Sequence, residues 1–308
     1  SHGGRALWGQ DALVDDGIRF NSVAKSFYQT SQQDLVSFTF LTDAFGLELH
    51  NKAAFHIYGC LPPDMADAEA PLLRQMSSIS AVSGFIRDAF CSVMDGRIRS
   101  ESITILSPGL PPAFTVSPKA ARKRDIDLVY AGRLVPRKGV DLVLEALEGL
   151  RNTSGLRPSL TVAGDGPEMK NLAQWVRDHD IRDQVSFVGS LSQSQLIEVF
   201  DRAKWFVYPT RKPEAFGLAP LEAMARGVPA IVGDLGGMAD YMRHGKNGHV
   251  LEHQDAHCLA RVLAEAYVAD ERRSHLVDEC LQTADRFSWA AFSENVNAFF
   301  SQACDSVP

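Results

Sequence analysis

The sequence has few cysteines, no long apolar run and no excess of basic residues. Its 5 cysteines are scattered over 308 residues without a Cys-x-x-Cys pair, which argues against a disulfide framework and against a zinc site. No run approaches the roughly 18 apolar residues of a membrane span, and we expect no signal peptide. These features predict a protein of the reducing cytoplasm, with contact to the inner face of the membrane left open.

The charge balance also excludes classes of partner. The formal net charge is -7 and the sequence pI is about 5.7, whereas a nucleic-acid-binding face needs concentrated basic residues. A short basic cluster between Lys119 and Arg124 is interpreted as a solvated linker. With 45% hydrophobic and 22% charged residues, the chain has the composition of a globular protein that is long enough for two domains.

Apolar runs and helical stretches alternate strictly from Ile126 onward. The predicted strands are 126–131, 160–163, 185–188, 205–208, 230–232 and 250–251. The predicted helices are about 139–150, 167–178, 194–203, 218–226 and 256–268, followed by 271–284 and 289–303. This pattern predicts a doubly wound parallel sheet, which binds ligands at the carboxyl ends of its strands where the strand order reverses.

The first part of the chain also reads as α/β. Strands are expected from 35 to 40, 53–58, 79–82 and 102–106, with helices at about 63–76 and 85–94 and the end of a helix at 23–28. The predicted domains are 1–116, a linker at 117–125, a second domain at 126–286, and a last helix at 287–308 that crosses back to the first domain.

Two glutamates lie between two predicted strands in the stretch from Tyr208 to Pro229. Glu214 lies in a loop, and Glu222 lies on a helix that is otherwise apolar or small. Burying a lone carboxylate is costly unless donors meet it, and a hydroxyl-rich ligand would supply them. The alternative stays open that Glu222 is a solvated first-turn charge, favoured by roughly 0.3 to 1 kcal/mol, and that Glu214 is an ordinary loop residue.

A basic loop at 132–139 follows the first strand of the second domain. Arg133 and Lys138 lie in this glycine-bounded loop, directly before a predicted helix. Amide donors, the helix dipole and two positive side chains together make a seat for a diphosphate. A solvated basic loop is the common alternative. We choose Arg133 and Lys138 as the binding residues and expect Arg137 to be exposed.

The spacing of these groups resembles a known family. Glu214 and Glu222, with seven residues between them, are similar to the Glu-x7-Glu signature of retaining GT-B glycosyltransferases of family 4, the glycosyl transferases group 1 type. The loop Gly-Arg, four residues, Lys-Gly resembles that family's donor-phosphate loop. The resemblance covers about residues 34–304. It implies an α/β fold of two Rossmann-like doubly wound domains, with the first shortened because only about thirty residues precede its first predicted strand.

The resemblance implies a donor site at the strand ends. Its substrate-binding residues would be Gly132, Arg133, Lys138, Gly164, Gly166, Val188, Gly189, Leu191, Glu214, Ala215, Phe216, Gly217, Leu218 and Glu222. Its catalytic residues would be Glu214, His56, Lys138 and Arg133. The diphosphate would lie on the two cations and the amides of 216–218, with the ribose on Glu222 and the transferred sugar on Glu214.

Two further positions are less specific. His56 ends a strand, where a histidine is often a satisfied structural residue, yet its place is similar to that of the family histidine that faces the donor. Gly236 and Gly237 resemble the family's late Gly-Gly loop, in which Ala239 and Asp240 stand here where Pro and Glu are usual. The shorter carboxylate of Asp240 leaves open whether a helix cap is kept.

The function implied is transfer of a sugar from a UDP- or GDP-linked donor, with retention of configuration. The sequence shows no metal cluster, so we expect metal-independent transfer and no cofactor. The acceptor, whether a saccharide, a lipid-linked glycan or a small molecule, and the oligomeric state cannot be read from the chain. One alternative is a nucleotide-sugar-binding protein without transferase activity. A dinucleotide-dependent oxidoreductase is disfavoured, because neither domain opens with Gly-x-Gly-x-x-Gly and a suitably spaced acidic residue.

Overall fold

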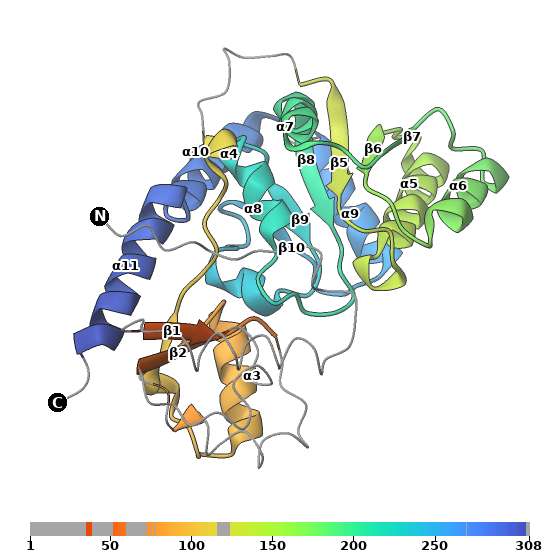
Figure 1. Ribbon diagram of the computed structural model, residues 1–308. Helices are drawn as coiled ribbons and strands as arrows, with labels where there is room; N and C mark the ends of the chain where they lie inside the picture. The colour runs from red at the N-terminus through yellow and green to blue at the C-terminus, as the bar shows by residue number, and fades with distance from the viewer. Residues whose placement is uncertain are drawn as a thin grey trace. The chain divides into compact units, whose positions relative to one another are not determined.

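The computed structural model describes residues 35–38, 52–59, 73–74, 76, 78–115, 124–268 and 270–305. The chain forms two compact units, each with a parallel sheet (Figure 1). The first unit comprises 1–82, 86–106 and 296–308, and the second comprises 83–85 and 107–295. The segment 107–116, which the sequence analysis placed in the first domain, therefore belongs to the second unit. The predicted helix at 23–28 and most of the one at 63–76 lie outside the described residues.

The first unit has a four-stranded sheet whose strands lie in chain order. The strands are β1 (Leu35–Phe38), β2 (Lys52–Ile57), β3 (Ser78–Ala81) and β4 (Ile103–Ile105), paired in parallel. The helix α3 (Gly84–Met94) connects β3 to β4 and buries Ile86, Phe90 and Met94. A helix between parallel neighbours is the βαβ arrangement that the alternating pattern predicts.

The second unit has a six-stranded parallel sheet in the order β10-β9-β8-β5-β6-β7. These strands are β5 (Ile126–Ala131), β6 (Leu160–Ala163), β7 (Val185–Gly189), β8 (Ala203–Tyr208), β9 (Ala230–Val232) and β10 (Gly248–Val250). The chain builds outward from β5 to β7, then returns and continues from β8 on the other side of β5. The strand order thus reverses between β5 and β8, which is where doubly wound sheets bind ligands.

The helices of the second unit lie close to their predicted positions, except for a short helix at Pro112–Thr115 that was not predicted. They are α4 (Pro112–Thr115), α5 (Val140–Ser154), α6 (Met169–Asp178), α7 (Gln193–Arg202), α8 (Leu218–Ala225), α9 (Ala256–Val268) and α10 (Asp270–Asp285). In the packing of these helices, α5 contacts α9 and α8 contacts α10 (Figure 1). The last helix, α11 (Trp289–Asp305), begins in the second unit and belongs to the first unit from Val296 onward.

The core of the second unit is centred on β5 and β8. Both are long apolar runs with almost every side chain buried, as expected for central strands covered on both faces. Two of the buried side chains, Tyr130 and Tyr208, stand at or next to the carboxyl ends of these strands and are 0% and 3% exposed. Each carries a hydroxyl group that needs a partner when buried, so polar contacts are expected at this edge of the sheet.

Arg124 corrects the prediction of a solvated linker. Its guanidinium group donates hydrogen bonds to the carbonyl oxygens of Phe200, at 3.1 Å, of Ala203, and of Arg226, at 2.8 Å. The pKa of Arg124 is lowered, chiefly because burial disfavours its charged form. Sequence reasoning grouped Arg124 with its basic neighbours at 119–123, which lie outside the described residues. Three long-range carbonyl partners could not be seen from that grouping.

The turns after β5 and β6 lie backbone to backbone. Gly164 has a φ of 138°, and a Cβ atom added there would lie 1.9 Å from the carbonyl oxygen of Gly132. A Cβ atom on Gly166 would lie 2.3 Å from the carbonyl oxygen of Leu134. The Leu134 amide also donates to the Asp165 carbonyl at 2.9 Å. These two glycines therefore fix the path of the chain on either side of Arg133.

Candidate functional site

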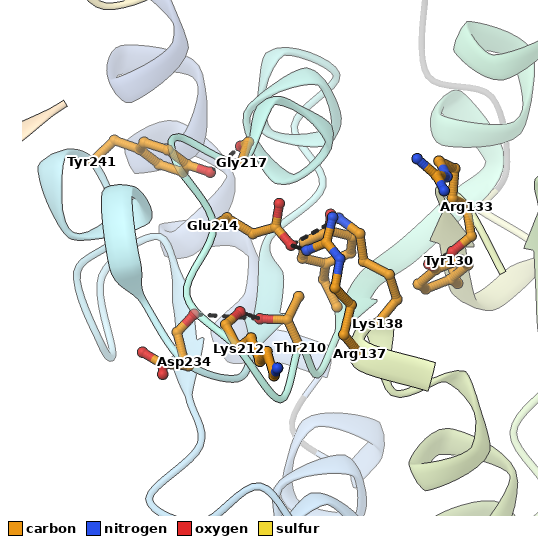
Figure 2. Close-up of polar contacts among 11 residues, drawn as sticks. Tyr130, Arg133, Arg137, Lys138, Thr210, Lys212, Glu214, Gly217, Asp234 and Tyr241 are labelled. Atoms are coloured by element: carbon orange, nitrogen blue, oxygen red, sulfur yellow. Dashed lines mark hydrogen bonds and ion pairs between the residues drawn. The ribbon is translucent and has the colours of Figure 1, made fainter. Parts of the chain in front are cut away.

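The candidate site lies at the carboxyl ends of β5 and β8, where the strand order reverses. The loop after β5 contains the short 3-10 helix η5 (Pro136–Lys138), and the loop after β8 contains Glu214. Lys138 Nζ lies 2.8 Å from Glu214 Oε1, and Arg137 Nη1 lies 2.7 Å from the same oxygen (Figure 2). The structure thus brings together two residues that the sequence singled out, Lys138 and Glu214, and one that it did not, Arg137.

Lys138 is an unusually buried lysine. The residue is 7% exposed, and its ammonium group donates a hydrogen bond to the hydroxyl oxygen of Tyr208 and lies 4.7 Å from the centre of that ring. Burial lowers the pKa of Lys138, while its hydrogen bond to Glu214 and the charge of that carboxylate act in the opposite direction. A buried ammonium group is tolerated only with such partners, so Lys138 depends on Tyr208 and Glu214.

Close backbone packing holds the two loops against each other. Gly139 has a φ of 72°, and a Cβ atom there would lie 2.2 Å from the carbonyl oxygen of Pro209. The amide of Gly237 donates to the Glu214 carbonyl at 2.7 Å, and the buried hydroxyl of Thr210 donates to the Lys212 carbonyl at 3.0 Å. The position of Glu214 is therefore set by its backbone as well as by the two cations.

Tyr130 and Tyr208 stack on each other, and Lys138 lies over the Tyr208 ring. The rings of Tyr130 and Tyr208 are 6.0 Å apart with an interplanar angle of 23°. The Tyr130 hydroxyl donates to the Arg133 carbonyl at 3.0 Å. Burial raises the pKa of both phenols, and the charge of Glu214 adds to the shift. Both hydroxyls therefore remain protonated at neutral pH and can donate hydrogen bonds.

Arg133 lies beside this group without joining its ion pairs. Its side chain is exposed, and Figure 2 shows it next to Tyr130, apart from the cluster around Glu214. Its charge is one of the causes that lower the pKa of Lys138. Arg133 is therefore near enough to add to the positive field over this loop and remains available to an anionic ligand.

Glu222 lies on the first turns of α8 and is mostly covered by protein. Burial raises the pKa of its carboxyl group, and within the described residues no hydrogen bond or ion pair engages it. Glu214 and Glu222 both raise the pKa of Tyr208 and of Tyr241 through their charges, so the two carboxylates act on the same pair of phenols. An ionised Glu222 has a strong need for donors, which a ligand hydroxyl would meet.

The start of α8 offers free backbone amides. Gly217 precedes the helix with a φ of 81°, and the Tyr241 hydroxyl donates to its carbonyl oxygen. Among the described residues, no acceptor meets the amides of Phe216, Gly217 and Leu218. Free amides at a helix amino end attract anions. This end of α8 follows the Glu214 loop directly, as the predicted diphosphate position requires.

The predicted base-binding residues lie at the end of the edge strand β7. Val188 is 40% exposed, Leu191 is half-buried, and Gly189 has a φ of 71°. The Gly164 amide donates to the Gly189 carbonyl at 2.7 Å, which joins this turn to the one after β6. Their contact with a nucleobase stays a prediction.

His56 belongs to the first unit and lies on β2. Its Nδ1 is 2.7 Å from the Ser80 hydroxyl oxygen, and its ring meets that of Tyr58 edge-on at 4.3 Å. Burial lowers the pKa of His56 to about 4, so the imidazole is neutral at physiological pH. These contacts fit a satisfied structural histidine, and the role of His56 toward a donor stays a prediction.

Asp240 answers the question that its short side chain raised. Its carboxylate accepts a hydrogen bond from the Gly84 amide at 2.9 Å, and the neighbouring Ser83 hydroxyl donates to the Ala215 carbonyl at 2.6 Å. All of these residues belong to the second unit. The Asp240 carboxylate therefore makes a local contact with Gly84 within the second unit, and the Ser83 hydrogen bond adds a further contact to the Glu214 loop.

Sequence reasoning missed Arg137 and Tyr208. Arg137 was expected to be exposed, and its side chain is indeed 45% exposed, yet its charged end contacts Glu214. Tyr208 was counted only as the last residue of a buried strand. An aromatic residue with a polar end at the carboxyl end of a central strand is a signal that could have identified it.

Neither a membrane span nor a metal cluster is found in the described part of the chain. No helix there is long and apolar enough to cross a bilayer. No group of three or more His, Cys, Asp or Glu residues among the described positions could hold a metal ion.

The sequence is similar to those of known glycosyl transferases. The family model described as "Glycosyl transferases group 1" matches residues 115–280. The glycogen synthase of Mycobacterium tuberculosis is 29% identical over 237 residues, covering 76% of this chain and 56% of that protein. A GDP-mannose-dependent alpha-(1-6)-phosphatidylinositol monomannoside mannosyltransferase of the same organism is 30% identical over 209 residues, covering 63% and 53%. The chain thus spans about half the length of these curated relatives.

Solved structures show the same fold. Sucrose-phosphate synthase from Thermosynechococcus elongatus has a TM-score of 0.80 at 17% identity, covering 98% of this chain and 82% of that one. HepE from Anabaena in complex with UDP has a TM-score of 0.76 at 19% identity, covering 92% and 81%. This likeness confirms the predicted GT-B fold class of two Rossmann-like α/β domains.

Proposed function

Because the chain belongs to the glycosyl transferases group 1 family, we propose that it is a retaining glycosyltransferase that uses a UDP- or GDP-linked sugar. The observation that carries this proposal is the contact of Lys138 with Glu214, 2.8 Å apart at the switch point of the sheet. One residue of this pair suits a diphosphate and the other suits sugar hydroxyls. Lys138 lies in the loop after β5 and Glu214 lies in the loop after β8, so both would contact one ligand bound between these two loops.

The diphosphate would lie between the basic loop and the start of α8. Lys138 and the exposed Arg133 provide positive charge from one side. The free amides at 216–218 provide donors and the helix dipole from the other. Such fixed positive groups stabilise the negative charge that develops on the leaving nucleotide, which is usually the largest contribution to catalysis.

The two carboxylates would divide the rest of the donor between them. Glu222, which lacks donors among the described residues, would accept hydrogen bonds from the ribose hydroxyls. Glu214 would hold the transferred sugar near its anomeric carbon, where an oxocarbenium-like charge develops. The acceptor oxygen would attack from the face that the phosphate leaves, and the departing phosphate oxygen would take the acceptor proton. Because bond formation and cleavage share one face, configuration is retained.

The donor base and the acceptor stay at the level of class. One relative is named as GDP-mannose-dependent and one solved neighbour is a complex with UDP, which supports testing both bases. We propose a saccharide, a lipid-linked glycan or a small molecule as acceptor. We also propose metal-independent transfer in the cytoplasm or at the inner membrane face, without a cofactor, since Lys138 and Arg133 provide the charge that a metal would supply.

A panel of nucleotide sugars tests transfer. The protein is incubated with UDP-glucose, UDP-N-acetylglucosamine, GDP-mannose and candidate acceptors, and release of nucleoside diphosphate is followed. We expect release with one donor class, and about a tenfold or larger loss in the variant Glu214→Gln, because the sugar loses its charged hydrogen-bond partner. Nucleotide binding with no release from any donor would instead indicate a nucleotide-sugar-binding protein without transferase activity.

A thermal-shift measurement tests the ribose contact. UDP or GDP should raise the melting temperature of the wild-type protein, because a ligand that binds only the folded state stabilises it. The variant Glu222→Ala should lose about half or more of this rise, since a charged hydrogen bond contributes roughly 1.5 to 3 kcal/mol. The 2′-deoxy nucleotide is the control. It should raise the melting temperature of the wild-type protein less than the full nucleotide does. In the Glu222→Ala variant, the two nucleotides should give the same rise. If the full nucleotide raises the melting temperature of the variant as much as that of the wild-type protein, Glu222 does not bind the ribose.

A further inference from the structure

Arg137 is not used by the mechanism above, yet its charged end lies in the site. We propose that Arg137 is a positioning residue that holds Glu214 in place for the donor sugar. The inference rests on the proposed function. It adds a third cation to the basic loop, with a role separate from those of Arg133 and Lys138.

The geometry divides the two oxygens of Glu214. Arg137 Nη1 and Lys138 Nζ both contact Oε1, at 2.7 and 2.8 Å. Within the described residues, no hydrogen bond or ion pair engages Oε2. Figure 2 shows both cations on one side of the carboxylate. The carboxylate is therefore fixed through one oxygen, and the other is left to accept hydrogen bonds from a ligand.

The charges explain why one cation is not enough. Before a ligand binds, Lys138 and Arg137 both face the single carboxylate of Glu214. A diphosphate carries two negative charges, and Lys138 would turn part of its hydrogen-bonding capacity toward it. Without Arg137, Glu214 would then lie next to the phosphates with a weakened partner, and like charges repel each other. Arg137 remains paired with the Glu214 carboxylate while Lys138 binds the phosphate.

The backbone around Arg137 is itself held in place. The Arg211 amide donates to the Arg137 carbonyl at 2.9 Å. The Arg211 guanidinium donates to the Pro136 carbonyl at 2.9 Å and pairs with both oxygens of Asp141 at 2.7 Å. The loop after β8 is thus bound to the turn η5 through Arg211, which is not part of the ion-paired cluster around Glu214. A fixed main chain lowers the entropy that Arg137 loses when its side chain reaches Glu214.

The affinity difference between nucleotide and nucleotide sugar tests the inference without an acceptor. Calorimetry is run with two pairs of ligands, UDP with UDP-glucose and GDP with GDP-mannose. For each pair, the dissociation constant of the nucleotide divided by that of the nucleotide sugar gives the contribution of the sugar. In the variant Arg137→Gln we expect this ratio to fall about fivefold to tenfold, while the affinity for the nucleotide alone changes less than about twofold. Arg137→Lys should restore part of the ratio, because it returns the charge.

Two controls separate positioning from general effects. Arg157→Gln removes an arginine that is similarly exposed, at 50%, and pairs with Asp183 outside the site, so it should leave both affinities unchanged. In a Glu214→Gln background, adding Arg137→Gln should have little further effect on the ratio, because Arg137 acts through that carboxylate.

The outcomes distinguish the two proposals. If neither nucleotide binds the wild-type protein, the proposed function fails and this inference fails with it. If the wild-type protein favours a nucleotide sugar and Arg137→Gln favours it equally, the proposed function stands and the positioning role is overturned. Equal losses for nucleotide and nucleotide sugar in Arg137→Gln also overturn it, since they would place Arg137 on the diphosphate.

Discussion

Replacing Lys138 with methionine is expected to weaken nucleoside diphosphate binding by about 100-fold or more. Methionine keeps the length of the side chain and removes its charge. Truncating one partner of a buried, hydrogen-bonded charge pair typically costs about 2 to 5 kcal/mol. Here Glu214 would keep only the partly exposed Arg137 as a cation, and the diphosphate would lose its most buried one. Calorimetry with UDP and GDP measures the change.

Lys204 offers a matched control for this substitution. It lies on the same strand that leads to the site, β8, but near its amino end, where it pairs with Asp127 at 2.9 Å. Lys204→Met removes the same charge and also breaks an ion pair, so it reports any general effect on the sheet. We expect its nucleotide affinity to match that of the wild-type protein. A Lys138→Met variant that binds as tightly as the Lys204 control would refute the diphosphate seat.

Replacing Gly164 with alanine is expected to destabilise the second unit by about 3 kcal/mol or more. A residue with a side chain at positive φ costs about 1 to 3 kcal/mol. In addition, the new Cβ atom would lie 1.9 Å from the Gly132 carbonyl oxygen, a backbone atom that moves only if the turn after β5 moves. Overpacking of this kind adds about 1 to 3 kcal/mol. The melting temperature should fall by about 10 °C, as followed by calorimetry.

The glycine at 149 gives the opposite result for the same chemical change. Gly149 lies within α5, and nothing lies within 4 Å of a Cβ atom added there. Alanine inside a helix is more stable than glycine by about 0.5 to 1 kcal/mol, so Gly149→Ala should raise the melting temperature slightly. If Gly164→Ala were as harmless as Gly149→Ala, the close backbone packing of the two turns would be refuted.

The fold of the second unit could be predicted well because its strands are buried on both faces. The central strand β5 has the predicted bounds, Ile126–Ala131, since every face of such a strand needs apolar residues. The edge strand β10 was expected at 250–251 and is found at Gly248–Val250. It is short and begins at a glycine whose Cβ atom would lie 2.0 Å from the Ala230 carbonyl oxygen. The start of β10 is therefore set by close backbone contact with β9, which a pattern of apolar residues does not reveal.

The site could be predicted only in part, because its contacts join distant parts of the chain. The sequence predicted that Lys138 and Glu214 share one site, because each lies in a loop after a predicted strand and their motifs resemble those of one family, and the structure places them 2.8 Å apart. The pairing of Arg137 with Glu214 joins residues 77 positions apart. Whether Arg137 or its neighbour points inward depends on the 3-10 turn η5, for which the sequence gives no clear periodic signal.

Arg124 has a practical consequence for anyone who wishes to produce the second unit alone. A fragment that starts just after this residue would leave the carbonyl oxygens of Phe200, Ala203 and Arg226 without their common donor. Each of these three hydrogen bonds contributes about 0.5 to 1.5 kcal/mol, and among the described residues the Phe200 carbonyl would keep only the Ala203 amide as a donor. The shortest useful fragment therefore has to begin upstream of Arg124, even though the first strand of the sheet starts only at Ile126.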